Sequence, residues 1–109
     1  MISGRIGDLV VSVEKINSLG IYRVYVEKFE NDCYVAWVYD FYPHESLSGA
    51  IEYSLERAKH DVPDAQIPLS SRIDMTPYTN AVSLHPPRIL AKKMDIKKLV
   101  KVVKKYLER

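Results

Sequence analysis

Five lysines near the end of the chain form the residue pattern that most favours a chemical role. Lys97 and Lys101, and likewise Lys101 and Lys105, are like charges four residues apart, and each such pair destabilises an isolated helix by about 0.2–0.5 kcal/mol. A helix with this pattern suits an anion such as the phosphate backbone of nucleic acid. The predicted phosphate contacts are Lys97, Lys98, Lys101, Lys104 and Lys105. The alternatives are a solvated helix end, where lysines suit the helix dipole, or docking on the acidic part of a second copy.

Aromatic residues form a second candidate group, on the outer face of a predicted hairpin. The aromatic residues are Tyr25, Phe29, Tyr34 and Tyr42, and Arg23 lies on the same face. Aromatic rings on a sheet can stack on unpaired bases, and arginine can stack or bind phosphate. We therefore predict Arg23, Tyr25 and Tyr34 as base or groove contacts. The alternative is that the C-terminal helix or a second subunit covers this face, so that the rings belong to a core or an interface.

Residues suited to metal binding or nucleophilic catalysis are scattered. Only His60, Asp61 and Asp64 cluster locally, and their spacing matches no zinc or calcium motif. A metal-dependent nuclease using these three residues is the third-ranked alternative. Cys33, the single cysteine, has no histidine nearby in the sequence to activate its thiol, and no glycine-rich phosphate loop occurs. We predict no catalytic residue, no metal site and no cofactor.

The charge of the chain is unevenly distributed. The 109 residues carry a formal net charge of +2, with 47% hydrophobic and 28% charged residues. Residues 1–90 hold 8 Lys and Arg against 12 Asp and Glu, whereas residues 91–109 hold 8 against 2. This composition excludes a disordered chain, a coiled-coil rod and a disulfide scaffold, and the length fits a single domain over residues 1–109.

The sequence also favours a location. No apolar run approaches the roughly 20 residues that span a bilayer, and residues 1–8 contain no apolar segment typical of a signal peptide. We therefore expect a cytoplasmic protein that does not bind membranes. Abundant Lys and Glu with a single Gln and a single Cys favour a thermophilic source.

Strands are predicted for the first half of the chain. Residues 8–14 alternate between two faces, and residues 20–29 and 33–42 are rich in β-branched and aromatic types. Asn31 and Asp32 tolerate positive φ, which indicates a tight hairpin between the second and third runs.

The hairpin register follows from its turn. With Asn31 and Asp32 at the tip, Val26 lies opposite Trp37 on an apolar face. Arg23 then lies directly opposite Asp40 on the outer face, a favourable cross-strand pair. A one-residue slip would break this pair and mix the two faces.

Two helices follow these strands. Ser46 is a predicted N-cap for a helix that covers the face of Val24 and Trp37 and ends near Pro63, and Asp95 is the N-cap for a basic helix over residues 95–108. Residues 62–92 contain five of the 6 prolines. We expect short edge strands there, at residues 72–75 and 81–84, or an extended arm that orders against a partner.

These observations predict an α+β domain. It comprises an antiparallel three- to five-stranded meander sheet packed by one amphipathic helix, with a basic C-terminal helix added. The predicted function is a small non-enzymatic nucleic-acid-binding or regulatory protein, with DNA and RNA both open as ligands. The alternative is a homo-oligomeric interaction or structural protein, such as a homodimer, with the aromatic sheet face buried between subunits.

Overall fold

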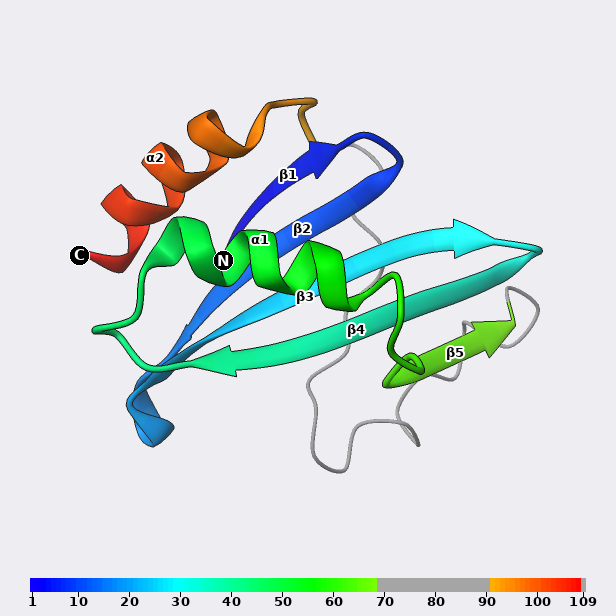
Figure 1. Cartoon of the computed structure of the whole chain (residues 1–109), viewed down its shortest axis with the longest axis horizontal. Helices are drawn as coiled ribbons and strands as arrows, with labels where there is room; N and C mark the ends of the chain where they lie inside the picture. The colour runs from blue at the N-terminus through cyan, green and yellow to red at the C-terminus, as the bar shows by residue number, and fades with distance from the viewer. Residues whose placement is uncertain (69–90, 109) are drawn as a thin grey trace.

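The computed structural model describes residues 1–68 and 91–108. These residues form a five-stranded antiparallel sheet, with strand order β1-β2-β3-β4-β5, and two α-helices (Figure 1). The predicted α+β class and antiparallel meander are confirmed. The elements are β1 (Ile2–Ile6), β2 (Leu9–Ile16), the 3-10 turn η1 (Asn17–Leu19), β3 (Ile21–Glu30), β4 (Cys33–Phe41), α1 (Leu47–Arg57), β5 (Ala65–Pro68) and α2 (Ile96–Leu107).

The β3–β4 hairpin has the register that its turn predicts. Asn31 and Asp32 both adopt positive φ, at 51° and 60°, as expected for a tight two-residue turn. Val26 pairs with Trp37, and Arg23 pairs with Asp40. Both sequence-based expectations for the hairpin are confirmed.

Strand β1 was not among the predicted elements. The strand has only five residues, ISGRI, and these include Ser3 and Gly4, so its strand propensity is low. The strand forms because Gly7, at φ 66°, turns the chain back and lets β1 pair with β2 along its full length. Pairing with a neighbour therefore overrides a weak local preference.

Helix α1 begins and packs as predicted. The side chain of Ser46 accepts a hydrogen bond from the Gly49 N–H group, which makes Ser46 the N-cap. Ala50 and Ile51 are buried in one cluster with Val24 of β3, so the helix covers the predicted face. Beyond the helix, the Trp37 indole N–H donates to the carbonyl oxygen of Asp61.

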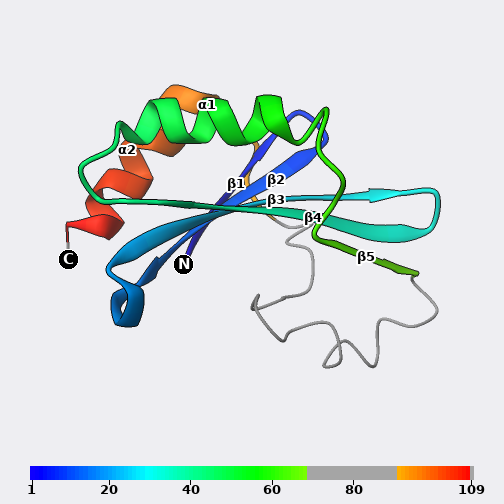
Figure 2. The ribbon, with the colours of Figure 1, turned by 60° about the horizontal axis from the view of Figure 1, so that its bottom comes forward.

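Helix α2 packs on the same face of the sheet as α1, beside it (Figure 2). Asp95 accepts a hydrogen bond from the Lys98 N–H group and is the predicted N-cap. Leu99 and Val103 are fully buried in the main core cluster, next to β1 and β2. The suggestion that this helix covers the outer, aromatic face is therefore wrong.

Three hydrogen bonds and one close approach fix the position of α2. The segment before the helix runs beside β1, where the Arg5 N–H group donates to the Lys92 carbonyl and the Met94 N–H group donates to the Arg5 carbonyl. At its other end, the Tyr106 hydroxyl accepts a hydrogen bond from the backbone N–H group of Lys15. Gly4 lies beneath the helix, where a Cβ would come within 2.7 Å of the Met94 sulfur.

Strand β5 extends the sheet beyond β4. It pairs antiparallel with the start of β4, from Ala65 opposite Ala36 to Pro68 opposite Cys33. Pro68 suits this position because β5 is a terminal strand of the five-stranded order. The predicted edge strands at residues 72–75 and 81–84 lie outside the described residues.

Candidate nucleic-acid interface

The lysine face of α2 consists of the five lysines predicted to contact phosphate. Leu99 and Val103 turn one side of the helix toward the sheet, and the lysines project from the other sides. At 3.6 residues per turn, the five side chains cover an arc of about 120° centred opposite the core. They are Lys97, Lys98, Lys101, Lys104 and Lys105, and each is exposed.

The lysine face is electrostatically uncompensated within the part of the chain that the structure describes. None of its five ammonium groups lies within 4.0 Å of a described carboxylate, although Lys28 and Lys59 each form such an ion pair. Four of the lysines flank an open hollow whose apolar part is Val102. Lys104 instead lines a separate cavity at the end of the helix. An exposed cationic ridge of this kind attracts polyanions.

Arg23 is held in place by the residue opposite it. Its Nε and Nη2 atoms donate to Oδ1 and Oδ2 of Asp40 at 2.6 and 3.0 Å, which is a bidentate ion pair. The paired carboxylate raises the pKa of Arg23, and only 11% of the arginine side chain is exposed. Because Tyr22 and Val24 face the helices, Arg23 lies on the opposite face of β3 from the lysine face.

The predicted base contacts Tyr25 and Tyr34 are buried. Their exposed fractions are 1% and 2%, so the rings offer no surface on which a base could stack. The Tyr25 hydroxyl donates to Glu14, and the Tyr34 hydroxyl donates to Glu27 at 2.7 Å. The structure thus brings the five lysines together on one helix and leaves Arg23, Tyr25 and Tyr34 on the other face of the sheet. On the same face, Phe29 is partly exposed.

The outer face contains a buried carboxylate that the sequence analysis missed. Glu27 is fully buried, and it accepts hydrogen bonds from the Tyr34 hydroxyl and from Ser12 at 3.4 Å. Ser12 is in turn 2.8 Å from the Ser3 hydroxyl. The predicted register could have indicated it, because it places Glu27 on the same face as Tyr25, among aromatic residues. A carboxylate in such surroundings needs hydrogen-bond donors.

The cluster His60, Asp61 and Asp64 is occupied by protein contacts. The Asp61 carboxylate accepts hydrogen bonds from Arg57 and from the Tyr39 hydroxyl, and Asp64 accepts one from the Val38 N–H group. Asp61 raises the pKa of Tyr39, after the larger effect of burial. Among residues 1–68 and 91–108, no three metal-ligating side chains converge on a common point.

Comparisons with protein-family models, curated proteins and solved structures find no significant match to this chain. Within the described residues, no helix has the length and apolar character needed to cross a membrane.

Proposed function

We propose that this protein binds nucleic acid through the lysine face of α2, without catalysing a reaction. The observation that carries the proposal is the set of five exposed ammonium groups on one helix, with no ion pair among the described residues. Arg23, Tyr25 and Tyr34 are left out, because an ion pair and burial occupy them. We also propose a cytoplasmic location, as the composition favours.

The spacing of the lysines suits a polyanion. Lys97 and Lys105 are eight residues apart, which is about 12 Å along a helix. Five positive charges over that length correspond to about one per 2.4 Å, against one negative charge per about 1.7 Å of duplex DNA. The two linear charge densities are of the same order, so the helix can neutralise several phosphates at once.

Salt dependence of binding tests the proposal. If four or five lysines each neutralise one phosphate of a DNA duplex, the logarithm of the binding constant should fall against that of the salt concentration with a slope of about −3.6 to −4.5. Fluorescence anisotropy with a labelled duplex and a labelled single-stranded RNA measures this slope. The double variant Lys97→Gln, Lys101→Gln should reduce it by about 1.8 and weaken duplex binding about 60-fold at 0.1 M salt.

A matched control separates the lysine face from net charge. The double variant Lys28→Gln, Lys59→Gln also removes two positive charges, but each of these lysines already pairs with a glutamate at 3.2 Å. This control should leave the slope unchanged. Equal losses of duplex affinity in the two double variants would show that only net charge matters and would refute the proposal. The proposal would also be refuted if the protein showed no salt-dependent binding to either DNA or RNA.

The homo-oligomer alternative stays a prediction. The rings of Tyr25 and Tyr34 are already buried within one chain, so they add no surface for a second copy. Light scattering at low and high salt distinguishes the two ideas. A dimer that persists in high salt and ignores nucleic acid would favour assembly over polyanion binding.

A further inference from the structure

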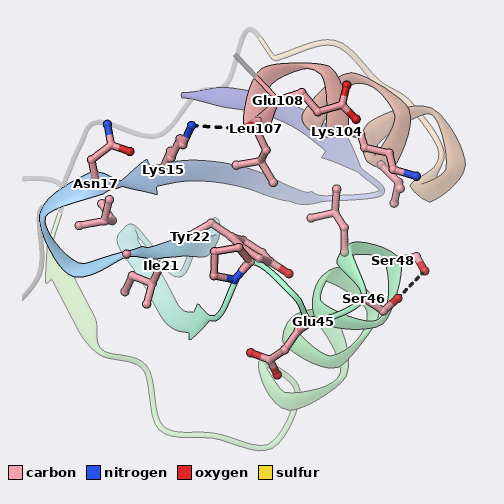
Figure 3. Close-up of a pocket in the computed structure, with 15 residues that line it drawn as sticks. Lys15, Asn17, Ile21, Tyr22, Glu45, Ser46, Ser48, Lys104, Leu107 and Glu108 are labelled. Carbon is pink, nitrogen blue, oxygen red and sulfur yellow. Dashed lines mark hydrogen bonds between the residues drawn. The ribbon is translucent and has the colours of Figure 1, made fainter.

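A cavity of about 580 Å³ lies where the start of α1 meets the end of α2 and the turn between β2 and β3 (Figure 3). This volume is within the range of about 300–1,000 Å³ that is typical of small-molecule sites. The cavity is separate from the hollow beside Val102 in the lysine face.

Apolar side chains supply much of the cavity wall, but seven of the fifteen lining residues besides Tyr22 are polar or charged, and they include the carboxylates of Glu45 and Glu108. The apolar lining residues are Ile16, Ile21, Pro43, Leu47, Val100 and Leu107. Lys104 also lines the cavity, and it forms no ion pair with the described residues. Lys15 donates to the carbonyl oxygen of Leu107, across the end of α2 (Figure 3). A ligand here would need an apolar body and a polar group.

The N-terminus of α1 contributes unpaired donors to this cavity. The helix has eleven residues, and its first N–H groups have no carbonyl partner within the helix. Ser46 accepts the hydrogen bond of the Gly49 N–H group, but the N–H groups of Leu47 and Ser48 have no acceptor among the described residues. Together with the positive end of the helix dipole, these two donors favour an anion.

Tyr22 supplies a second, independent observation that points to a ligand. Its side chain lines the cavity and its hydroxyl is aimed toward the first turn of α1 (Figure 3). The residue is only 3% exposed, and its hydroxyl is buried without a hydrogen-bond partner in the described part of the chain. Burial, and secondarily the charge of Glu45, raise the pKa of this phenol, so it remains a proton donor at neutral pH.

An unpaired buried hydroxyl lowers stability, and phenylalanine would fill the same space without that cost. A tyrosine at such a position is expected where the hydroxyl serves binding rather than folding. Glu45 raises the pKa of Tyr22 but accepts no hydrogen bond from its hydroxyl; the Glu45 carboxylate instead accepts one from the Tyr42 N–H group at 2.6 Å.

We propose that this cavity binds a small amphipathic anion, with a carboxylate or phosphate head and an apolar tail. The head accepts hydrogen bonds from the Tyr22 hydroxyl and from the N–H groups of Leu47 and Ser48. The tail lies against Val100 and Leu107, and Lys15 and Lys104 offset the negative charge of Glu45 and Glu108 in the lining. Lys104 belongs to both sites, but Tyr22 and α1 lie outside the lysine face, so this proposal can be tested separately from nucleic-acid binding.

Thermal unfolding with a panel of probes tests this proposal. The probes are octanoate, octyl phosphate, inorganic phosphate and uncharged octanamide, each at millimolar concentration. Octanoate or octyl phosphate should raise the unfolding temperature in a concentration-dependent way, and the larger shift identifies the preferred head group. Inorganic phosphate should have a weaker effect because it lacks a tail, and octanamide because it lacks the charge.

The variant Tyr22→Phe provides the decisive comparison. Without a probe, it should unfold about 4 °C higher than the original protein, because it removes an unpaired buried hydroxyl. Its affinity for the preferred probe should fall at least tenfold in isothermal titration calorimetry. The control Tyr42→Phe, which removes the hydroxyl of a strongly exposed tyrosine outside the cavity lining, should bind the probe normally.

Three results would overturn the proposal. They are no shift with any charged probe, equal shifts with octanamide and octanoate, and undiminished probe affinity in Tyr22→Phe. The salt slope for DNA binding should be the same in Tyr22→Phe as in the original protein. Loss of the cavity proposal therefore leaves the nucleic-acid proposal standing, and the reverse also holds.

Discussion

Replacing Lys101 with glutamine is expected to stabilise the fold while weakening nucleic-acid binding. Lys101 occupies the middle of the lysine face, four residues from both Lys97 and Lys105. Each like-charge pair at this spacing costs about 0.2–0.5 kcal/mol, so removing two of them should add about 0.4–1 kcal/mol to the free energy of unfolding. With an unfolding entropy of about 2.1 cal/mol/K per residue over the chain, the unfolding temperature should rise by about 2–4 °C.

Thermal unfolding followed by circular dichroism, in low salt and in 1 M salt, measures this effect. In 1 M salt the Debye length is about 3 Å, shorter than the about 5–6 Å between neighbouring Cβ atoms on a helix, so the gain should largely disappear. The matched control is Lys59→Gln. Lys59 pairs with Glu56 at 3.2 Å, so its replacement removes an attraction and should give no gain at either salt concentration.

The same Lys101→Gln variant should bind a DNA duplex about 8-fold more weakly at 0.1 M salt, with a slope smaller by about 0.9. Stability and binding would then change in opposite directions at one position, as expected where a helix tolerates repulsion in order to hold an anion. A variant that is no more stable in low salt would refute the repulsion argument. Unchanged DNA affinity would refute the role of Lys101 in binding.

Three further predictions concern packing and the outer face. Gly4→Val should lower the free energy of unfolding by about 1–3 kcal/mol in urea, because a Cβ at Gly4 would lie 2.7 Å from the Met94 sulfur; an unchanged midpoint would contradict the close packing of α2 on β1. Glu27→Ala should lower the free energy of unfolding by about 1–3 kcal/mol in the same assay, because the buried 2.7 Å hydrogen bond from the Tyr34 hydroxyl is lost. Burial raises the pKa of Tyr25 from 10.0 to about 12. The stability that the protonated Tyr25 hydroxyl contributes is therefore complete below pH 10 and is lost as the pH rises to 12. The unfolding temperature between pH 9 and pH 12 should therefore decline less in Tyr25→Phe than in the original protein.

Much of the fold follows from local sequence. The positive φ of Asn31 and Asp32 sets the hairpin turn, and the Arg23–Asp40 pair agrees with the register that this turn imposes. The N-caps Ser46 and Asp95 start both helices where the sequence predicts. These features can be predicted from the sequence because each depends on residues that are close in the chain or on a single short turn.

The candidate sites were only partly predictable from the sequence. The lysine face follows from helical spacing, but the cavity beside Tyr22 does not, because its lining comes from β2, β3, α1 and α2. The sequence left the burial of Tyr25 and Tyr34 open as one of two alternatives, and the structure shows both rings buried. Alternation along β3 and β4 places side chains on a face, but it does not show whether that face is covered.

The sequence by itself determined the strand register of the hairpin, the helix starts and the concentration of positive charge in residues 91–109. Only the tertiary structure decided that β1 pairs with β2 and that α2 shares the face of α1, leaving Arg23 on the other side of the sheet. The physical reason is the range of the interactions. Turns, caps and periodicity act over a few residues, whereas the Lys15–Tyr106 hydrogen bond and the packing of Gly4 beneath α2 join segments about ninety residues apart.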